Sequence, residues 1–346
     1  MYERTLAIRA RQIPYFRTEQ FSQVMSDCDF RLKNLIGTEN NSSIMYLGAS
    51  GTGAMEAAVI NIIKPGARVL VVNGGVFGAR FVQICSVHGF VVDELIVPVY
   101  SDLKSEDFNK SKFNKYDAVL VNLHETSIGK LYSISIISDF CKENGAILMV
   151  DAITTFMCEE YRMDEWGVDV TILSSHKGLC LSPGLSMVVL NNKMKKNIIL
   201  NSSKLYFDFA LYLEDIKRFQ TPFTPPVGIL LELQDMLHFI EEFGSKNWFD
   251  RVEKRASYFR KLVDQDVVDM PTYSMSNSIT PMYLKYGGAV NLFNYLRDEC
   301  DFIVNPSGGN YRDNMIRVSH IGNVELSDYN DLWGSMSDFF RINKTV

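Results

Sequence analysis

The chain of 346 residues is 47% hydrophobic and 22% charged, with a formal net charge of −6 at pH 7. This balance is typical of a globular protein with room for one large domain and a smaller one. The sequence holds no basic block and no apolar run of the ~18–20 residues that a membrane span requires. We therefore expect neither nucleic acid nor a membrane as a partner, and the charged residues 1–11 do not resemble a signal peptide.

The six cysteines form no C-x-x-C pair, and the five histidines show no metal-ligand spacing. Reduced and mostly buried thiols are typical of a cytoplasmic protein. The sequence therefore predicts a cytoplasmic location and no metal site.

Strands and helices alternate through the first part of the chain. Predicted strands cover residues 44–47, 68–72, 91–97, 117–123, 147–150, 170–173 and 185–190. Predicted helices cover residues 22–36, 54–63, 77–88, 101–114 and 133–144. Apolar strands separated by helices predict an α/β fold with a mostly parallel sheet covered on both faces. Ligands of such sheets bind beyond the carboxyl ends of the strands.

The pattern changes at residues 206–226, where residues 222–226 contain three prolines and exclude a helix. An extended segment is expected over residues 218–226. Helices follow at 228–243 and 246–263, then a strand at 281–284, a helix at 289–299, strands at 302–305 and 315–319, and a helix at 326–340. We expect residues 1–245 to form a large domain and residues 246–346 a small α/β domain.

Two charged residues end two of the buried strands. Asp151 closes the strand at 147–150, and Lys177 follows the strand at 170–173 through Ser-Ser-His. A lysine and an acid, each at the carboxyl end of a strand, are typical of a pyridoxal-phosphate site, where the lysine forms a Schiff base and the acid pairs with the pyridinium nitrogen. The alternatives are a solvated loop lysine and an aspartate that caps a helix.

The turn Gly-Ala-Ser-Gly-Thr-Gly at residues 48–53 lies between a predicted strand and a helix. Its glycine spacing is neither the G-x-G-x-x-G of dinucleotide sites nor a P-loop. The N–H groups of Ser50, Gly51 and Thr52, with two hydroxyls, are able to hold one phosphate at the helix N-terminus. The alternative is a tight turn that packs against the sheet.

Three further residues are candidates for the same site. Phe77 opens a helix directly after a strand, where an aromatic ring either joins the core or stacks on a flat cofactor. Thr126 follows another strand and is a candidate for hydrogen bonding to the cofactor's phenolic oxygen. Arg317 lies within an apolar strand, so a buried guanidinium there requires a partner. A substrate carboxylate or a structural ion pair would provide one.

Seven stretches together resemble a known family, the class V aminotransferases of fold type I, in the group of alanine–glyoxylate, serine–pyruvate and 2-aminoethylphosphonate aminotransferases. The stretches occur in the family's order and cover the chain from about residue 14 to its end. They are SGTGAMEA at 50–57, NGGVFG at 73–78, HETSIG at 124–129, VDA at 150–152, SHKG at 175–178, TPFTPP at 221–226 and RVSHIG at 317–322.

The resemblance implies a role for each matching residue. Lys177 is the Schiff-base lysine and proton carrier, Asp151 pairs with the ring nitrogen, and Phe77 stacks on the ring. The ring oxygen is contacted by Thr126, and a substrate carboxylate by Arg317. The phosphate is held by Ser50, Gly51, Thr52 and His176. Members of the family are homodimers with their sites at the interface, so Thr224 and Thr221 of the neighbouring subunit are also expected to reach the phosphate.

The chain departs from the family pattern at two places. A Gly-Pro segment that lines the substrate pocket of relatives is expected before Met1, upstream of the given sequence. His176 stands where many aminotransferases have Gln or Asn, and a His-Lys pair also occurs in cysteine desulfurases. Those enzymes need a loop cysteine in the small-domain half, where Cys300 is the only cysteine and no glycine-rich loop surrounds it.

The sequence therefore predicts that the protein is a pyridoxal-phosphate-dependent aminotransferase. It moves an amino group between a small amino acid or aminophosphonate and a keto acid such as pyruvate or glyoxylate. One alternative is a lyase or desulfurase that uses the same cofactor on a small amino acid. The other is a non-catalytic module that binds a sugar or nucleotide.

Overall fold

A seven-stranded sheet forms the centre of the computed structural model, which describes residues 1–110, 115–200 and 203–343. Its strand order is β1-β9-β8-β7-β4-β2-β3, and β9 is antiparallel to both of its neighbours. The other six strands run in one direction. The strands are β1 (Ser43–Leu47), β2 (Arg68–Asn73), β3 (Val91–Ile96), β4 (Ala118–Asn122), β7 (Ile147–Asp151), β8 (Val170–Ser174) and β9 (Ser186–Leu190).

Helices cover both faces of this sheet. Successive side chains of a strand point to opposite faces, so each strand contributes to two cores. In β4, Val119 and Val121 join one core, whereas Ala118 and Leu120 join the other. The first core is completed by α2 (Glu19–Ile36), α5 (Ile134–Asn144) and α8 (Val227–Phe243), and the second by α3 (Gly51–Ile62), α4 (Val76–Val87) and α7 (Phe209–Ile216). Two buried faces explain why the central strands are continuously apolar, as the sequence predicted.

Local signals set the ends of α2. The hydroxyl of Thr18 accepts the N–H of Phe21, which starts the helix three residues before the predicted position. Gly37 ends it in the left-handed region, with φ of 69°.

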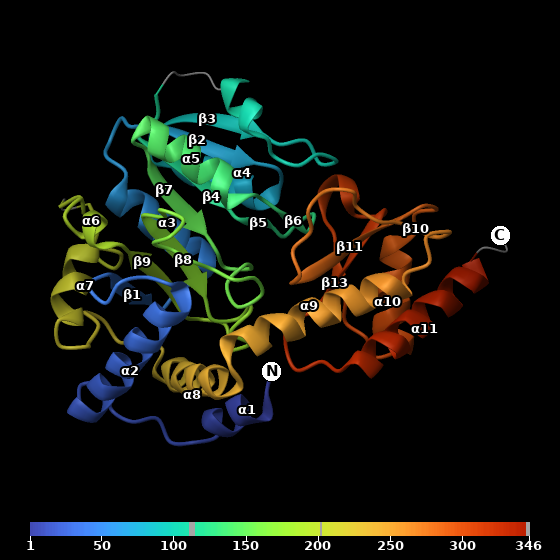
Figure 1. Cartoon of the computed structure of the whole chain (residues 1–346). Coiled ribbons are helices and arrows are strands. Elements are labelled where there is room, and N and C mark those ends of the chain that lie inside the picture. Colours follow the sequence, from blue (N-terminus) through green and yellow to red (C-terminus); the bar gives the residue numbers. More distant parts are fainter. Residues whose placement is uncertain (111–114, 201–202, 344–346) are drawn as a thin grey trace.

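A second sheet with its own core forms the carboxyl-terminal part of the chain (Figure 1). Its strands are antiparallel, in the order β10-β11-β13-β12. They are β10 (Val268–Asp269), β11 (Ile279–Leu284), β12 (Asn305–Pro306) and β13 (Met315–Ser319), and they are accompanied by α10 (Ala289–Glu299) and α11 (Leu326–Asn343).

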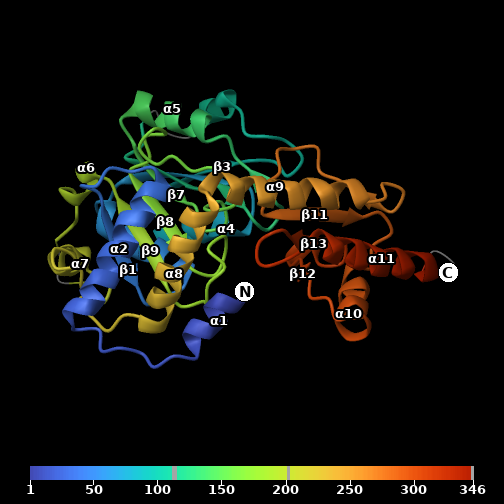
Figure 2. The same cartoon turned by 60° about the horizontal axis from the view of Figure 1, so that its bottom comes forward.

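Helix α9 (Ser245–Leu262) joins the two parts, as Figure 2 shows. Near its start, Trp248 and Val252 belong to the core of the large sheet. Near its end, Phe259 belongs to the core of the small sheet. Because one helix contacts both cores, the division into domains after residue 245 stays a prediction.

Some expected elements differ from the structure. The prediction of a helix at 101–114 is wrong over residues 101–110, which contain only the 3₁₀ helix η1 (Ser105–Lys110). Residues 111–114 lie outside the described residues. At the start of η1, the carboxylate of Asp107 accepts the N–H of Lys104 over 2.9 Å and closes a short turn.

Several short elements were not predicted from the sequence: α1 (Glu3–Arg9), α6 (Asn192–Lys195), α7, β10, and the two-stranded ribbon of β5 (His124–Glu125) and β6 (Lys130–Leu131). Five of the six cysteines are buried as free thiols. Among the described helices, none has the length and apolar character to cross a membrane.

Candidate active site

Strand β8 places Lys177 just beyond the carboxyl edge of the large sheet. All five residues of the strand are buried, and the turn that follows is tied down by the N–H of Cys180, which donates to the Lys177 carbonyl over 2.8 Å. Burial lowers the pKa of the Lys177 amine, and the charge of Arg317 acts in the same direction. A lowered pKa increases the neutral, nucleophilic fraction of a lysine at neutral pH.

Asp151 ends β7, the parallel neighbour of β8, and pairs with Ile172 in the register of the sheet. Its Oδ1 accepts the N–H of Ile153 over 2.8 Å. Burial, with a contribution from the charge of Glu125, raises the pKa of the Asp151 carboxyl to about 7, against the opposing effects of the Ile153 N–H and the charge of Lys177. A cation at this carboxylate would offset the cost of its burial.

The turn after β1 leads directly into α3. Ser50 caps this helix, with its Oγ accepting the N–H of Gly53 over 3.3 Å. Within the described ranges, the N–H groups of Ser50, Gly51 and Thr52 donate no hydrogen bond. A Cβ at Gly51 would lie 2.5 Å from Ile153 Cδ1, so only glycine fits there without displacing that side chain. Free N–H groups at a helix N-terminus bind anions such as phosphate.

Phe77 is held at the start of α4 by a buried acid. The carboxylate of Glu125 accepts the N–H of Phe77 over 3.2 Å and that of Gly78 over 3.1 Å. A Cβ at Gly75 would lie 2.6 Å from Glu125 Cδ, so the glycine lets the acid approach. The acid thus satisfies two free N–H groups at the start of α4 and holds the backbone of Phe77 in place.

Two threonines and a histidine lie beside Asp151. The hydroxyls of Thr126 and Thr154 are 2.7 Å apart. His124 is 1% exposed, its Nδ1 lies 3.1 Å from the hydroxyl of Ser278, and its Nε2 has no hydrogen-bond partner among the described residues. Burial lowers the pKa of His124 to about 3, so its ring is neutral at neutral pH.

These side chains line one cavity of about 230 Å³. It combines an anion-binding helix terminus, a carboxylate, an aromatic ring and an amine, which are the groups that fit pyridoxal phosphate. The lining residues are Ser50, Gly51, Thr52, Met55, Phe77, His124, Thr126, Asp151, Ile153, Thr154, His176 and Lys177.

Arg317 does not line this cavity but reaches its wall from β13. Its Nη1 donates to the carbonyl of Thr126 over 2.7 Å, and its Nη2 donates to Asn305 Oδ1 and to the Pro306 carbonyl. The Nε is buried and has no partner in the described part of the chain. Burial lowers the pKa of the guanidinium. The arginine therefore joins the small sheet to the site through carbonyl and amide acceptors instead of a carboxylate.

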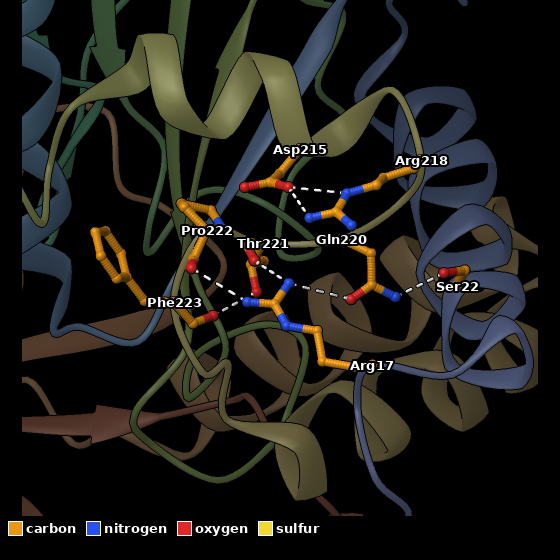
Figure 3. Close-up of polar contacts among 8 residues, drawn as sticks. All are labelled: Arg17, Ser22, Asp215, Arg218, Gln220, Thr221, Pro222 and Phe223. Atoms are coloured by element: carbon orange, nitrogen blue, oxygen red, sulfur yellow. Dashed lines mark hydrogen bonds and ion pairs between the residues drawn. The ribbon is translucent and has the colours of Figure 1, made fainter.

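Thr221 and Thr224 also lie outside the cavity, on the segment between α7 and α8. The hydroxyl of Thr221 is buried and donates to the carbonyl of Phe223 over 2.7 Å, as Figure 3 shows. Thr224 is exposed. The structure of one chain thus brings together the residues predicted for the ring and the lysine, but not these two threonines.

Residues that the sequence analysis did not assign also shape the site. Glu125 and His124 belong to a quoted motif, yet nothing in the sequence distinguished their roles. Thr154, in the turn after β7, contacts the hydroxyl of Thr126 and donates to the carbonyl of His124 in β5 over 3.5 Å. Arg80 donates from α4 to Thr52 Oγ1 over 3.2 Å and brings a positive charge to the phosphate end.

The sheet order and this arrangement of side chains define a fold type I pyridoxal-phosphate enzyme. A solved structure of an aspartate aminotransferase of subgroup IV from Thermus thermophilus has the same fold, with a TM-score of 0.90 and 23% identity, over 98% of this chain and 95% of that one.

Two curated relatives span nearly the same length. The protein named "Soluble hydrogenase, small subunit" from Synechococcus sp. is 29% identical over 89% of this chain and 82% of its own. The L-aspartate–glyoxylate aminotransferase of Paracoccus denitrificans is 27% identical over 89% of this chain and 80% of its own. The model of the class V aminotransferases matches residues 2–291, and the chain belongs to that family. It is an aminotransferase that depends on pyridoxal phosphate.

Proposed function

We propose that pyridoxal phosphate binds in the cavity beyond β7 and β8, with Lys177 as its covalent anchor. The observation that carries this proposal is that the Lys177 amine and the Asp151 carboxylate line one cavity with the anion-binding start of α3. Ser50, Gly51, Thr52 and His176 hold the phosphate, and Thr126 contacts the ring oxygen. Phe77 covers one face of the ring.

The protein groups have separate tasks in the reaction. When bound, the cofactor withdraws electrons from the substrate's α-carbon. Asp151, in its ionised form, keeps the ring nitrogen protonated. Lys177, whose pKa is lowered, would bond as the neutral amine to the aldehyde carbon of the cofactor with loss of water, and once displaced by the substrate amine it would carry the proton that leaves the α-carbon. Glu125 holds Phe77 in place by accepting two backbone N–H groups.

We further propose that the amino donor is a small amino acid and the acceptor a keto acid such as glyoxylate or pyruvate. The name of the Paracoccus denitrificans relative supports glyoxylate. Arg317 supports a carboxylate-bearing substrate, because its guanidinium lies beside Thr126 without an acidic hydrogen-bond partner among the described residues. An aminophosphonate fits the same cationic group and stays an alternative donor.

The active unit that we propose is a homodimer in the cytoplasm. The position of Thr224, exposed and outside the cavity of its own chain, supports a role for this residue at the site of a partner subunit. The free buried thiols support a reducing compartment. The division into domains at residues 1–245 and 246–346 belongs to the same proposal.

A spectroscopic screen of donors tests the function. The purified protein is loaded with pyridoxal phosphate and exposed to single amino acids and to an aminophosphonate, without a keto acid. We expect one equivalent of the yellow chromophore to be lost with the true donor, and glyoxylate or pyruvate to restore it. Sustained turnover without any keto acid would instead identify a lyase, and a chromophore indifferent to every donor would refute the assignment.

A further inference from the structure

Arg17 bridges the start of the chain to the segment that carries Thr221 and Thr224. It lies in the loop between α1 and α2. Its Nη1 donates to the carbonyl of Thr221 over 2.7 Å and to Gln220 Oε1 over 3.4 Å, and its Nη2 donates to the carbonyl of Pro222 over 3.1 Å (Figure 3). One guanidinium thus holds two successive backbone carbonyls.

The segment at residues 217–226 has little regular structure of its own. Three of its residues are prolines, which donate no backbone hydrogen bond. Phe219 adopts a left-handed conformation with φ of 54°, which is unfavourable for a residue with a side chain. The N–H groups of residues 218–220 bond back to the end of α7. Beyond them side chains hold the segment, those of Arg17, Gln220 and Thr221 among them.

A second contact comes from α2, on the same side as Arg17. Gln220 Nε2 donates to Ser22 Oγ over 2.6 Å. Together the two contacts fix the segment before it turns into α8. Figure 3 shows Arg17 and Ser22 approaching the segment from the amino-terminal part of the chain.

The far end of the segment is tied to the phosphate end of the site. The ring of Phe223 stacks on that of Tyr206, with centroids 5.2 Å apart and planes 21° apart. The hydroxyl of Tyr206 in turn donates to the carbonyl of Gly48, where the turn that leads into α3 begins. Thr224 follows Phe223 and is exposed. The contacts that hold residues 220–223 therefore determine where the hydroxyl of Thr224 is presented.

We propose that Arg17 is a positioning residue for cofactor phosphate binding: it fixes residues 220–224 so that Thr224 presents its hydroxyl to the phosphate held in the partner subunit. This inference rests on the homodimer of the proposed function. Arginine is required because its planar fork donates to two carbonyls at once, whereas a lysine ammonium is a flexible point donor. Arg17→Lys therefore retains the charge but loses the simultaneous hydrogen bonds to the two carbonyls.

The test compares two ligands that differ only in the phosphate. Cofactor-free protein is titrated with pyridoxal phosphate and with pyridoxal in wild type, Arg17→Gln, Arg17→Lys and Thr224→Ala. We expect the affinity for pyridoxal phosphate to fall about tenfold in the three variants, which is the size of one hydrogen bond to a charged group. The affinity for pyridoxal is expected to stay unchanged. The control Arg218→Gln removes a cation of the same loop, one that contacts Asp215, and is expected to bind both ligands normally.

Combining Arg17→Gln with Thr224→Ala is expected to cause no further loss, because both changes remove the same contact. Normal binding of pyridoxal phosphate by Arg17→Gln would overturn the inference. Equal weakening of both ligands would also overturn it, since a purely structural role affects the whole site. Wild-type protein that binds neither ligand would refute the proposed function itself.

Mixed dimers identify the subunit on which Arg17 acts. In a dimer of Arg17→Gln with Lys177→Ala, the chain that keeps Lys177 faces a partner with Arg17 intact, and we expect borohydride to trap the cofactor on it normally. In a dimer of wild type with the double variant Arg17→Gln/Lys177→Ala, the chain that keeps Lys177 faces a damaged partner, and we expect weak trapping. The reverse result would place the effect within one subunit and overturn the inference.

Discussion

Replacing Asp151 with Asn is expected to stabilise the cofactor-free protein at neutral and alkaline pH. Burial raises the pKa of the Asp151 carboxyl to about 7, from a value of 3.8 in the unfolded chain; the charge of Glu125 raises it and that of Lys177 lowers it. The folded protein therefore binds the proton more tightly than the unfolded chain does. The stability contributed by this group is fully present below pH 3.8, declines as the pH rises, and is lost above about pH 7.

The difference between the two pKa values determines how much stability the Asp151 carboxyl loses at high pH. A separation of about three units corresponds to about 4 kcal/mol at 1.36 kcal/mol per unit, and this is an upper limit because charged groups relax toward water. Asparagine keeps an oxygen that accepts the N–H of Ile153 but carries no charge, so it avoids this cost. Pyridoxal phosphate is expected to reverse the order of stability, because the protonated ring nitrogen pairs with the Asp151 carboxylate.

The assay is urea denaturation of the cofactor-free proteins at pH 5, 6, 7 and 8. We expect the advantage of Asp151→Asn in free energy of unfolding to grow with pH and to level off near pH 8. Asp331→Asn, on the exposed side of α11, controls for the change of residue type. An advantage that stays constant across the pH range, or a wild type that is more stable at pH 8 without cofactor, would refute the reasoning.

Two further changes test the supports of the site. Gly178→Ala places a Cβ 2.1 Å from the Phe156 carbonyl oxygen, so the loop that carries Lys177 must move. We expect a loss of about 2 kcal/mol in the free energy of unfolding and less chromophore at saturating cofactor; an unchanged denaturation midpoint would contradict the geometry. Arg80→Gln removes the cation that donates to Thr52. It is expected to weaken cofactor binding about fivefold at low salt and less at high salt, and titrations that match wild type at both salt concentrations would exclude this role.

The sequence predicted the fold well where hydrophobic pattern and capping agree. The central strands of the large sheet are apolar on both sides, and Gly37 and Gly145 mark helix ends that the structure shows in the left-handed conformation. Helix α7 escaped prediction because it lies next to a proline-rich segment. Its start depends on the Asp208 side chain, which accepts the N–H of Ala210 over 3.0 Å. Such short-range contacts do not appear in a periodic pattern.

For the site, the strand ends could be predicted and the contacts between loops could not. Asp151 and Lys177 were found because each follows a buried strand, and parallel strands bring their carboxyl ends to one edge. The bond from Arg317 to the carbonyl of Thr126 joins residues 191 positions apart. The hydrogen bond from Arg17 to the carbonyl of Thr221 joins residues 204 positions apart. No local signal encodes either pairing, because each depends on how the elements pack.

The most direct test of the central claim is to identify the lysine that bonds to the cofactor. The protein is loaded with pyridoxal phosphate, reduced with borohydride, digested and mapped by tandem mass spectrometry. The account predicts a pyridoxyl group on Lys177 and its absence in Lys177→Ala. Modification of Lys130 instead, a buried lysine whose pKa burial lowers to about 8, or of no lysine at all, would contradict the account.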